Sequence, residues 1–419
     1  MFSSFFRFFK ELDQRVKIIT LGTGLYAWDF TLPQQYNMLY ASALGINPFI
    51  LGTLSSIGRA LNSIISIPIG WVADRYGVKK AVLIGLAIFT LVAGSYAFAF
   101  DQRLIIPALI LGSISIVYPF TDIIIINYTK PQQRTMVMAF ARTIWAIPNI
   151  FIPMIAALIV TNFGGITIEG IRPLYYIQLA LALFLFLFVV VKLQTPSAKS
   201  TESRNAPKLK RNSFIQDFIE MFKGEKHLKK WLILQTIFWF SQFFAMPFTS
   251  LWMVNIKGAD PYILGAMLTV SQIMSTILQI PVGRLADKIG RKKVFFILRP
   301  LTYLGTLLLI MAPSPEYLIL IGILGGVGMI GAGGGGIGGV SFIPFITMNF
   351  EMVPAEKRGR WRGVTSIFNL ISFPVSILGG IMWQQGLMIE VMLIPILAEI
   401  LIMIPIMITV PDTLGRSKK

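Results

Sequence analysis

Two segments of the chain repeat each other without a gap: residues 47–85, NPFILGTLSSIGRALNSIISIPIGWVADRYGVKKAVLIG, and residues 260–298, DPYILGAMLTVSQIMSTILQIPVGRLADKIGRKKVFFIL. The offset is a constant 213 residues, and 14 of the 39 positions are identical. Generic hydrophobicity could match isoleucine to isoleucine, but it would not produce the shared pattern G-x-x-x-D-[RK]-x-G-x-K-K. The repeat therefore indicates that the chain contains two similar structural halves.

The composition is that of a membrane protein. Of 419 residues, 55% are hydrophobic and 13% are charged, whereas a soluble domain carries about 25% charged residues. The mean hydropathy of +0.72 agrees. The absence of cysteine excludes a disulfide framework and a thiol nucleophile, and the single histidine, His227, excludes a multi-histidine metal site.

Windows of roughly 20 mostly apolar residues predict membrane-spanning helices. Twelve such windows cover residues 17–40, 48–73, 81–100, 104–127, 135–161, 174–193, 229–255, 261–283, 294–312, 316–348, 362–385 and 389–410. Long runs such as LYYIQLALALFLFLFVVV exclude the alternating strands of a membrane barrel. The predicted fold class is an all-α polytopic membrane protein with two six-helix bundles.

The predicted domain organisation has five parts. They are an amphipathic cytosolic N-terminus (1–16), a first bundle (17–193), a charged linker (194–228), a second bundle (229–410) and a cytosolic tail (411–419). Basic residues accumulate in cytosolic loops, and this arrangement puts 31 of the 37 Lys and Arg residues there. We therefore expect both termini on the cytoplasmic side of the cell membrane. The net charge of +18 is then explained by topology and by contacts with anionic lipid, without nucleic acid.

The loop sequences GWVADRYGVKK (residues 70–80) and GRLADKIGRKK (residues 283–293) resemble the loop 2–3 and loop 8–9 signature of the major facilitator superfamily. VPAEKRG, residues 353–359, resembles that family's loop 10–11. The resemblance covers the whole chain and implies two parallel bundles that rock about a central site. In transporters built from such repeats, the substrate lies near the midplane where the halves meet.

The resemblance also implies a cytosolic gate. Its residues are Gly70, Asp74, Arg75, Gly77, Lys79, Gly283, Asp287, Lys288, Gly290 and Arg291. The glycines at 70 and 283 are expected to permit close helix contact, and those at 77 and 290 to adopt positive φ. Asp74 is expected to face the start of span 11, while Arg75 and Lys79 pair with acids near loop 4–5 or remain at the lipid headgroups.

Ionisable residues within spans are functional candidates, because they are costly in a membrane. They are Asp29, Arg59, Asp122, Arg142, Arg299 and Glu399. Asp29 lies half-way along span 1, where an ionised carboxylate is costly, so we expect it to take up and release the coupling proton; Asp122 is the second proton candidate. Alternatively, Asp29 is a structural partner of Arg59 or of the backbone. A salt bridge between Asp122 and Arg142 is plausible from their similar depth, and Arg299 is expected to reach the cytosolic surface.

Polar residues on the predicted lining helices are candidates for the substrate cavity. They are Arg59, Arg142, Gln235, Trp239, Gln242, Gln272 and Asn369. Gln235 and Gln242 are seven residues apart and share a helix face with Trp239, which suits a polar neutral or amphipathic ligand. Span 10 contains the glycine-rich run 322–339, and because glycine weakens helices we expect this span to bend.

The predicted function is secondary active transport of a small organic molecule, coupled to protons, in either the efflux or the uptake direction. The alternatives are a transporter-like receptor or scaffold without turnover, and an organic-anion uniporter or exchanger. A membrane enzyme is disfavoured, since no histidine cluster, Ser/His pair or paired acids lie within the spans. No cofactor or metal is expected, and the chain is expected to be a monomer.

Overall fold

A computed structural model describes residues 12–114, 124–125, 128–129, 133–193, 226–326, 335–353, 361, 364–365, 368, 370 and 373–413, and within these ranges all regular elements are helices. The side chains of residues 66–76, 134–135, 139 and 226 lie outside this description. The helical architecture agrees with the predicted fold class.

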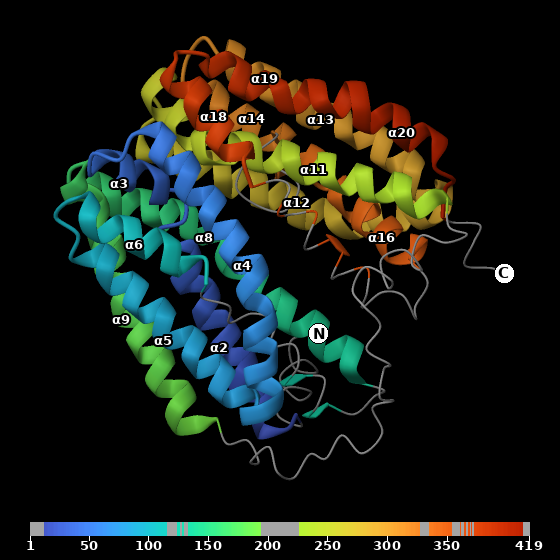
Figure 1. The fold of residues 1–419 in the computed structure, drawn as a ribbon. Helices are drawn as coiled ribbons and strands as arrows, with labels where there is room; N and C mark the ends of the chain where they lie inside the picture. Colours follow the sequence, from blue (N-terminus) through green and yellow to red (C-terminus); the bar gives the residue numbers. More distant parts are fainter. Residues whose placement is uncertain are drawn as a thin grey trace. The chain divides into compact units, whose positions relative to one another are not determined.

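Contacts divide the chain into two compact units (Figure 1). The first comprises Met1–Gly45 and Leu61–Pro207, and the second comprises Ile46–Ala60 and Lys208–Lys419. The helix α4 (Pro48–Tyr76) contributes to both. The first half of α4 is thus assigned to the second unit. The bundle boundaries at residues 17–193 and 229–410 remain a prediction.

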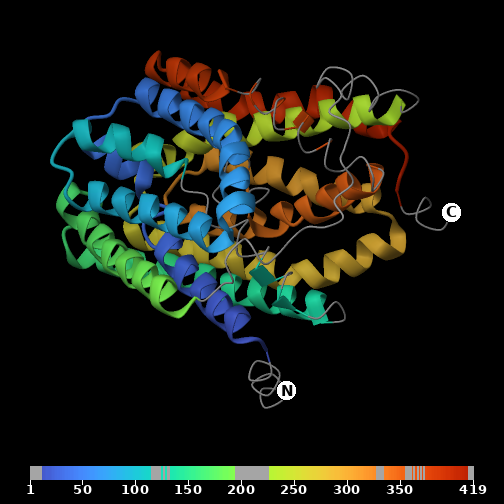
Figure 2. The same ribbon diagram turned by 60° about the horizontal axis from the view of Figure 1, so that its bottom comes forward.

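The first unit is built on helices of 7 to 29 residues. Besides α4 they are α2 (Gln14–Thr31), α3 (Asn37–Ala43), α5 (Val78–Ala97), α6 (Gln102–Gly112), α8 (Arg134–Asn162) and α9 (Ile168–Lys192). Helix α5 packs along α9, and α2 packs against α8 and α9 (Figures 1 and 2). Their buried faces form one apolar core that includes Val16, Leu86, Val137 and Leu185.

The second unit contains the remaining elements. They are α11 (Lys226–Leu251), the π-helix η3 (Trp252–Ile256), α12 (Pro261–Ile289), α13 (Arg291–Met311), α14 (Tyr317–Leu324), α15 (Gly336–Gly339), α16 (Phe342–Met352), α18 (Val375–Gln384), α19 (Met388–Ala398), the π-helix η6 (Glu399–Met403) and α20 (Ile404–Thr409). Helix α11 packs against α18 and α19, and α12 packs against α14 and α13. In the core of this unit the Phe345 ring stacks on Phe238 and packs at a tilt against Trp231 and Phe295.

Seven helices of the described chain are long and apolar enough to cross a membrane. The count of twelve spans is thus not confirmed, because several predicted spans are broken. Span 1 is divided into α2 and α3 at Leu32–Tyr36, next to Pro33. Along span 10, α14 ends at Leu324, and Gly325 and Gly336 have φ of +91° and +61°. The expected softness of this glycine-rich segment agrees with that early end.

The two repeats have matching local structure at the start of their third helices. Gly77 and Gly290, the residues before α5 and α13, have φ of +93° and +111°, which confirms the predicted positive φ. Lys79 donates to the carbonyl of Val190 (3.1 Å), and Lys292 donates to that of Val410 (2.7 Å). Both lysines therefore satisfy carbonyls at the end of the last helix of their own half, where partial negative charge collects. The prediction that Lys79 pairs with an acid or stays at the headgroups remains a prediction, and the structure adds a backbone partner.

Candidate functional site

Asp29 is the only charged side chain of α2 that the structure describes as completely buried. Neither of its carboxylate oxygens has a hydrogen-bond partner among the described residues. Nearby on the same helix, the ring of Tyr26 packs against Phe89 and Trp145, with centroid distances of 5.0 and 5.9 Å. An unpartnered carboxyl group in such apolar surroundings is costly to ionise.

Asp29 lies at the end of a helix that proline interrupts. Its backbone carbonyl would normally accept from the amide four residues on, but that residue is Pro33, which has no N–H. Gln178 of α9 supplies the missing donor through its Nε2, 3.3 Å from the Asp29 carbonyl oxygen. The chain after the break is held by α8, where Gln35 donates to the carbonyl of Pro153 (3.1 Å).

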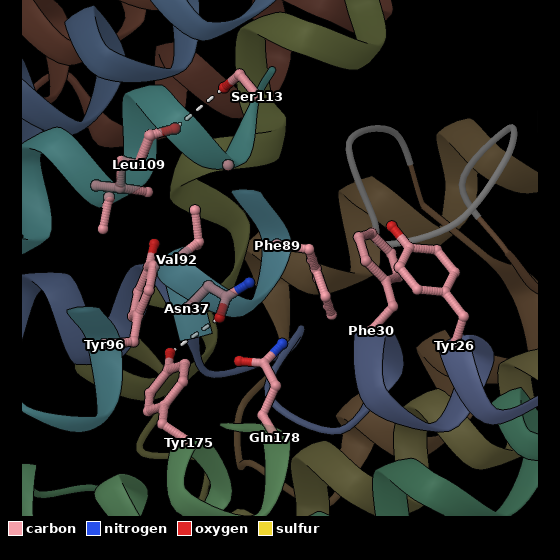
Figure 3. A pocket seen from close by; sticks show the side chains of 12 residues that line it. Tyr26, Phe30, Asn37, Phe89, Val92, Tyr96, Leu109, Ser113, Tyr175 and Gln178 are labelled. Carbon is pink, nitrogen blue, oxygen red and sulfur yellow. Dashed lines mark hydrogen bonds between the residues drawn. The ribbon is translucent and has the colours of Figure 1, made fainter. Parts of the chain in front are cut away.

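Side chains from α2, α3, α5, α6 and α9 line a partly open cavity of about 240 Å³ within the first unit (Figure 3). Gln178 lines it, together with Tyr26 and Phe30, which flank Asp29 in sequence. Sequence reasoning missed this cavity, because no single segment carries its polar groups. The available signal was Gln178 itself, a polar residue inside the otherwise apolar run of span 6.

Arg59 belongs by its contacts to the second unit. Its guanidinium donates to the hydroxyl of Ser376 and, at 3.5 Å, to that of Ser56. It also lies 4.5 Å above the centre of the Phe243 ring. Arg59 is thus held by neutral partners, and the alternative in which it pairs with Asp29 is not supported.

Two of the predicted cavity residues in the second unit lie together. Gln235 and Trp239 line a small cavity of about 70 Å³, and the buried Gln235 Oε1 has no hydrogen-bond partner among described residues. Gln242 is buried but does not line this cavity. Gln272 is half-buried on α12.

The remaining candidates are less informative. Arg142 lies on α8 with an exposed side chain. Asp122 and Asn369 lie outside the described residues, and so do the side chains of Asp74 and Arg75 and the surroundings of Gly70. The predicted pair of Asp122 with Arg142 therefore stays a prediction.

The gate motif of the second unit forms an ion-pair network. Arg291, whose side chain is 11% exposed, lies 2.6 Å from Glu351 of α16 and 3.3 Å from Asp287. Lys288 is exposed. A Cβ added at Gly283 would meet no described atom within 4 Å, so the close helix contact expected there is not seen in the part of the chain that the structure describes.

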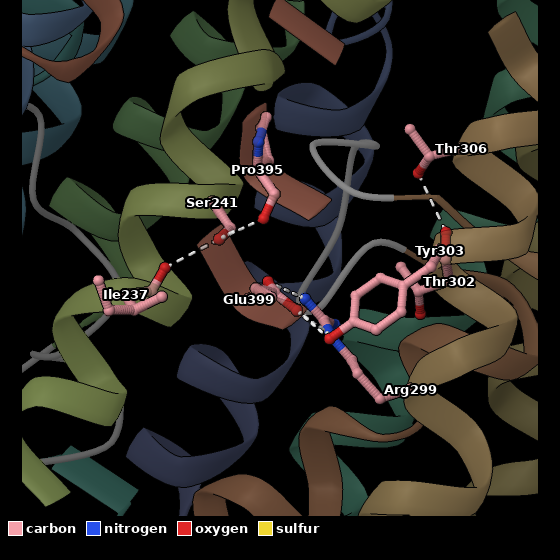
Figure 4. A network of polar contacts seen from close by, with 8 residues as sticks. All are labelled: Ile237, Ser241, Arg299, Thr302, Tyr303, Thr306, Pro395 and Glu399. Atoms are coloured by element: carbon pink, nitrogen blue, oxygen red, sulfur yellow. Dashed lines mark hydrogen bonds and ion pairs between the residues drawn. The ribbon is translucent and has the colours of Figure 1, made fainter. Parts of the chain in front are cut away.

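A buried ion pair in the second unit was not predicted. Arg299 of α13 and Glu399 of η6 are both fully buried and form two hydrogen bonds, Nε to Oε2 at 2.7 Å and Nη2 to Oε1 at 2.5 Å. The Tyr303 hydroxyl donates to Glu399 Oε2 at 2.8 Å (Figure 4). The expectation that Arg299 reaches the surface was wrong, because the carboxylate of Glu399 satisfies its charge inside the bundle.

One family model matches most of the chain, and several solved transporters share its fold. The model of the Major Facilitator Superfamily matches residues 19–380. A variant of the nucleoside transporter NupG has a TM-score of 0.69 and 17% identity, over 95% of this chain and 100% of that one. A D-xylose–proton symporter has a TM-score of 0.66 and 12% identity over 96% and 98%. A POT family transporter in complex with 5-aminolevulinic acid has a TM-score of 0.68 and 13% identity over 96% and 99%. No curated protein matches.

Proposed function

We propose that this chain, which belongs to the Major Facilitator Superfamily, moves a small organic solute across the membrane by alternating access and couples that movement to protons. The family and its transporter-like fold support secondary transport. The proton is the finer part of the proposal, and it rests on residues of the first unit. We place the protein in the cell membrane with both termini in the cytoplasm, as the distribution of basic residues predicts.

The proposal rests on the surroundings of the Asp29 carboxyl group. Its carboxyl group is fully buried, has no hydrogen-bond partner among described residues, and lies where Pro33 ends the first part of a membrane span. Interrupted helices of transporters are where coupling ions are bound. A carboxyl group without a fixed counter-charge can be neutral in one conformation and ionised in another, which is what proton coupling requires.

The experiment is transport in proteoliposomes with the purified full-length chain. Asp29→Asn removes the exchangeable proton and keeps nearly the same shape. We expect uptake driven by an imposed pH gradient to fall at least tenfold, while exchange of solute between the two sides, measured without a gradient, stays within about twofold of the unchanged protein.

A matched control is Glu169→Gln, which neutralises an exposed acid in the first turn of α9 and should leave both activities unchanged. Gradient-driven uptake that persists in Asp29→Asn would contradict the assignment of the proton to Asp29. Absence of any solute movement by the unchanged protein, with sugars, organic anions and neutral heterocycles, would contradict transport itself.

A further inference from the structure

The 240 Å³ cavity of the first unit has walls suited to one class of molecule. None of the described side chains that line it is charged. A cavity slightly below the usual range for drug-sized ligands, about 300–1,000 Å³, has room for one or two small rings. Since burying an uncompensated charge is costly, this described lining favours a neutral occupant.

Aromatic rings form two walls of the cavity. Tyr96 and Tyr175 are stacked, with centroids 4.8 Å apart and planes inclined by 22°, and Tyr26 and Phe89 form a second pair at 5.0 Å. Figure 3 shows Tyr96 and Tyr175 on one side and Tyr26 with Phe30 on the other. Aromatic faces of this kind pack well against a planar ring.

Two side-chain amides lie between these walls, and each has one polar atom engaged (Figure 3). The Tyr175 hydroxyl donates to Asn37 Oδ1 at 2.9 Å, which leaves the Asn37 Nδ2 as an unused donor. Gln178 Nε2 donates to the Asp29 carbonyl, which leaves the Gln178 Oε1 as an unused acceptor. No further hydrogen bond of either side chain occurs with the described residues.

We propose that this cavity binds a neutral planar heterocycle with an amide edge, that is, a ring in which a carbonyl group adjoins an N–H. The carbonyl of such a ring accepts from Asn37 Nδ2, and its N–H donates to Gln178 Oε1. The ring plane lies between the aromatic walls. This inference rests on the proposed function, because it names the class of solute that the transporter carries.

The same site connects the ligand to the proton. Gln178 holds the carbonyl of Asp29 with one end of its amide and faces the cavity with the other. A ligand that bonds to Gln178 therefore contacts the one side chain that replaces the helix hydrogen bond missing at Pro33. Occupancy of the cavity and the position of Asp29 are linked through a single residue.

The test is binding of uracil and of hypoxanthine to the purified full-length chain, measured by calorimetry. 1,3-Dimethyluracil is the matched probe, since it keeps the ring and both carbonyls but has no N–H. We expect saturable binding of uracil or hypoxanthine, and at least tenfold weaker binding of the dimethyl compound, because that compound leaves the buried Gln178 acceptor without a donor. This comparison uses the unchanged protein and does not depend on how well any variant folds.

Substitutions then locate the site. Gln178→Leu and Asn37→Leu should each weaken uracil binding at least tenfold. Asn162→Leu, at an exposed asparagine of α8 whose amide donates to the carbonyl of Leu158, should change it less than twofold. Absence of saturable binding of both heterocycles, equal binding of the dimethyl compound, or undiminished binding by Gln178→Leu would each overturn the proposal.

Failure of this inference and failure of the proposed function give different results. Gradient-driven uptake of another solute, with no binding of the heterocycles, contradicts the ligand class alone. Saturable uracil binding that depends on Asn37 and Gln178, without any uptake into proteoliposomes, supports the cavity assignment and contradicts transport.

Discussion

Asp29 and Glu399 are both completely buried carboxyl groups, but their surroundings differ. Glu399 accepts two hydrogen bonds from Arg299 and one from Tyr303, whereas Asp29 accepts none from described residues. A buried ion pair compensates the charges of both partners, and removal of one partner leaves an uncompensated charge. These hydrogen bonds distinguish Glu399, a structural carboxylate, from Asp29, which we propose as the group that transfers the proton.

We predict that Glu399→Gln destabilises the protein strongly, because it leaves Arg299 charged and buried. Breaking one partner of a buried ion pair costs about 3–5 kcal/mol. The measurement is the free energy of unfolding of the purified protein in lipid bicelles.

The double variant Arg299→Met with Glu399→Leu removes both charges and should be more stable than Glu399→Gln, since apolar replacement of a whole buried pair is often neutral. Asp287→Asn breaks an exposed pair, with the Asp287 side chain 69% exposed, and should cost no more than about 1 kcal/mol. A double variant as unstable as Glu399→Gln would contradict this account.

Several of the helices are interrupted at proline or glycine residues. Pro33 ends α2, and glycines with positive φ follow α14. The backbone groups freed at each break need other partners. At Pro33 the freed carbonyl of Asp29 accepts a hydrogen bond from Gln178 of α9. At the end of α14, the Gly325 carbonyl lies so near Gly305 of α13 that an added Cβ would overlap it.

Gly305→Ala should therefore destabilise the second unit. The new methyl group meets backbone rather than a movable side chain, and overpacking of this kind costs about 1–3 kcal/mol. Thermal unfolding in detergent is the measurement.

Gly94→Ala is the matched control on α5. Its added Cβ would lie 3.7 Å from Leu179 Cδ1, an ordinary contact, and alanine favours a helix over glycine by up to about 1 kcal/mol. The control should leave stability unchanged or raise it. If Gly305→Ala behaves like Gly94→Ala, the close approach of α13 to Gly325 is not a constraint on packing.

The whole molecule consists of two related halves. Both halves have a glycine with positive φ just before their third helix, α5 or α13. In both, a lysine of that helix donates to a carbonyl at the end of the last helix, α9 or α20. From the sequence repeat we predict two halves in one orientation, with the 194–228 segment and both termini on the same side of the membrane.

The absence of cysteine from the chain makes this topology directly testable. We predict that Ser203→Cys, in the 194–228 segment, is not labelled by a membrane-impermeant maleimide applied to intact cells. Gln102→Cys, at the exposed start of α6, should be labelled under the same conditions. The reverse pattern would exclude the predicted orientation.

The helical membrane class, the internal repeat and the positive φ of Gly77 and Gly290 could all be predicted from the amino-acid sequence. These properties depend on composition or on neighbours along the chain, so they do not depend on how the helices are arranged. The sequence also singled out Asp29, because a charge within an apolar span is visible in one dimension.

Which polar groups lie in contact could be seen only in the tertiary structure. Arg299 pairs with Glu399, a residue 100 positions away, and the amides of Asn37 and Gln178 line one cavity although they lie on α3 and α9. Such meetings depend on how each helix is rotated and how far it is displaced along its neighbours. Side chains from many segments determine those quantities together, so no single stretch of sequence records them.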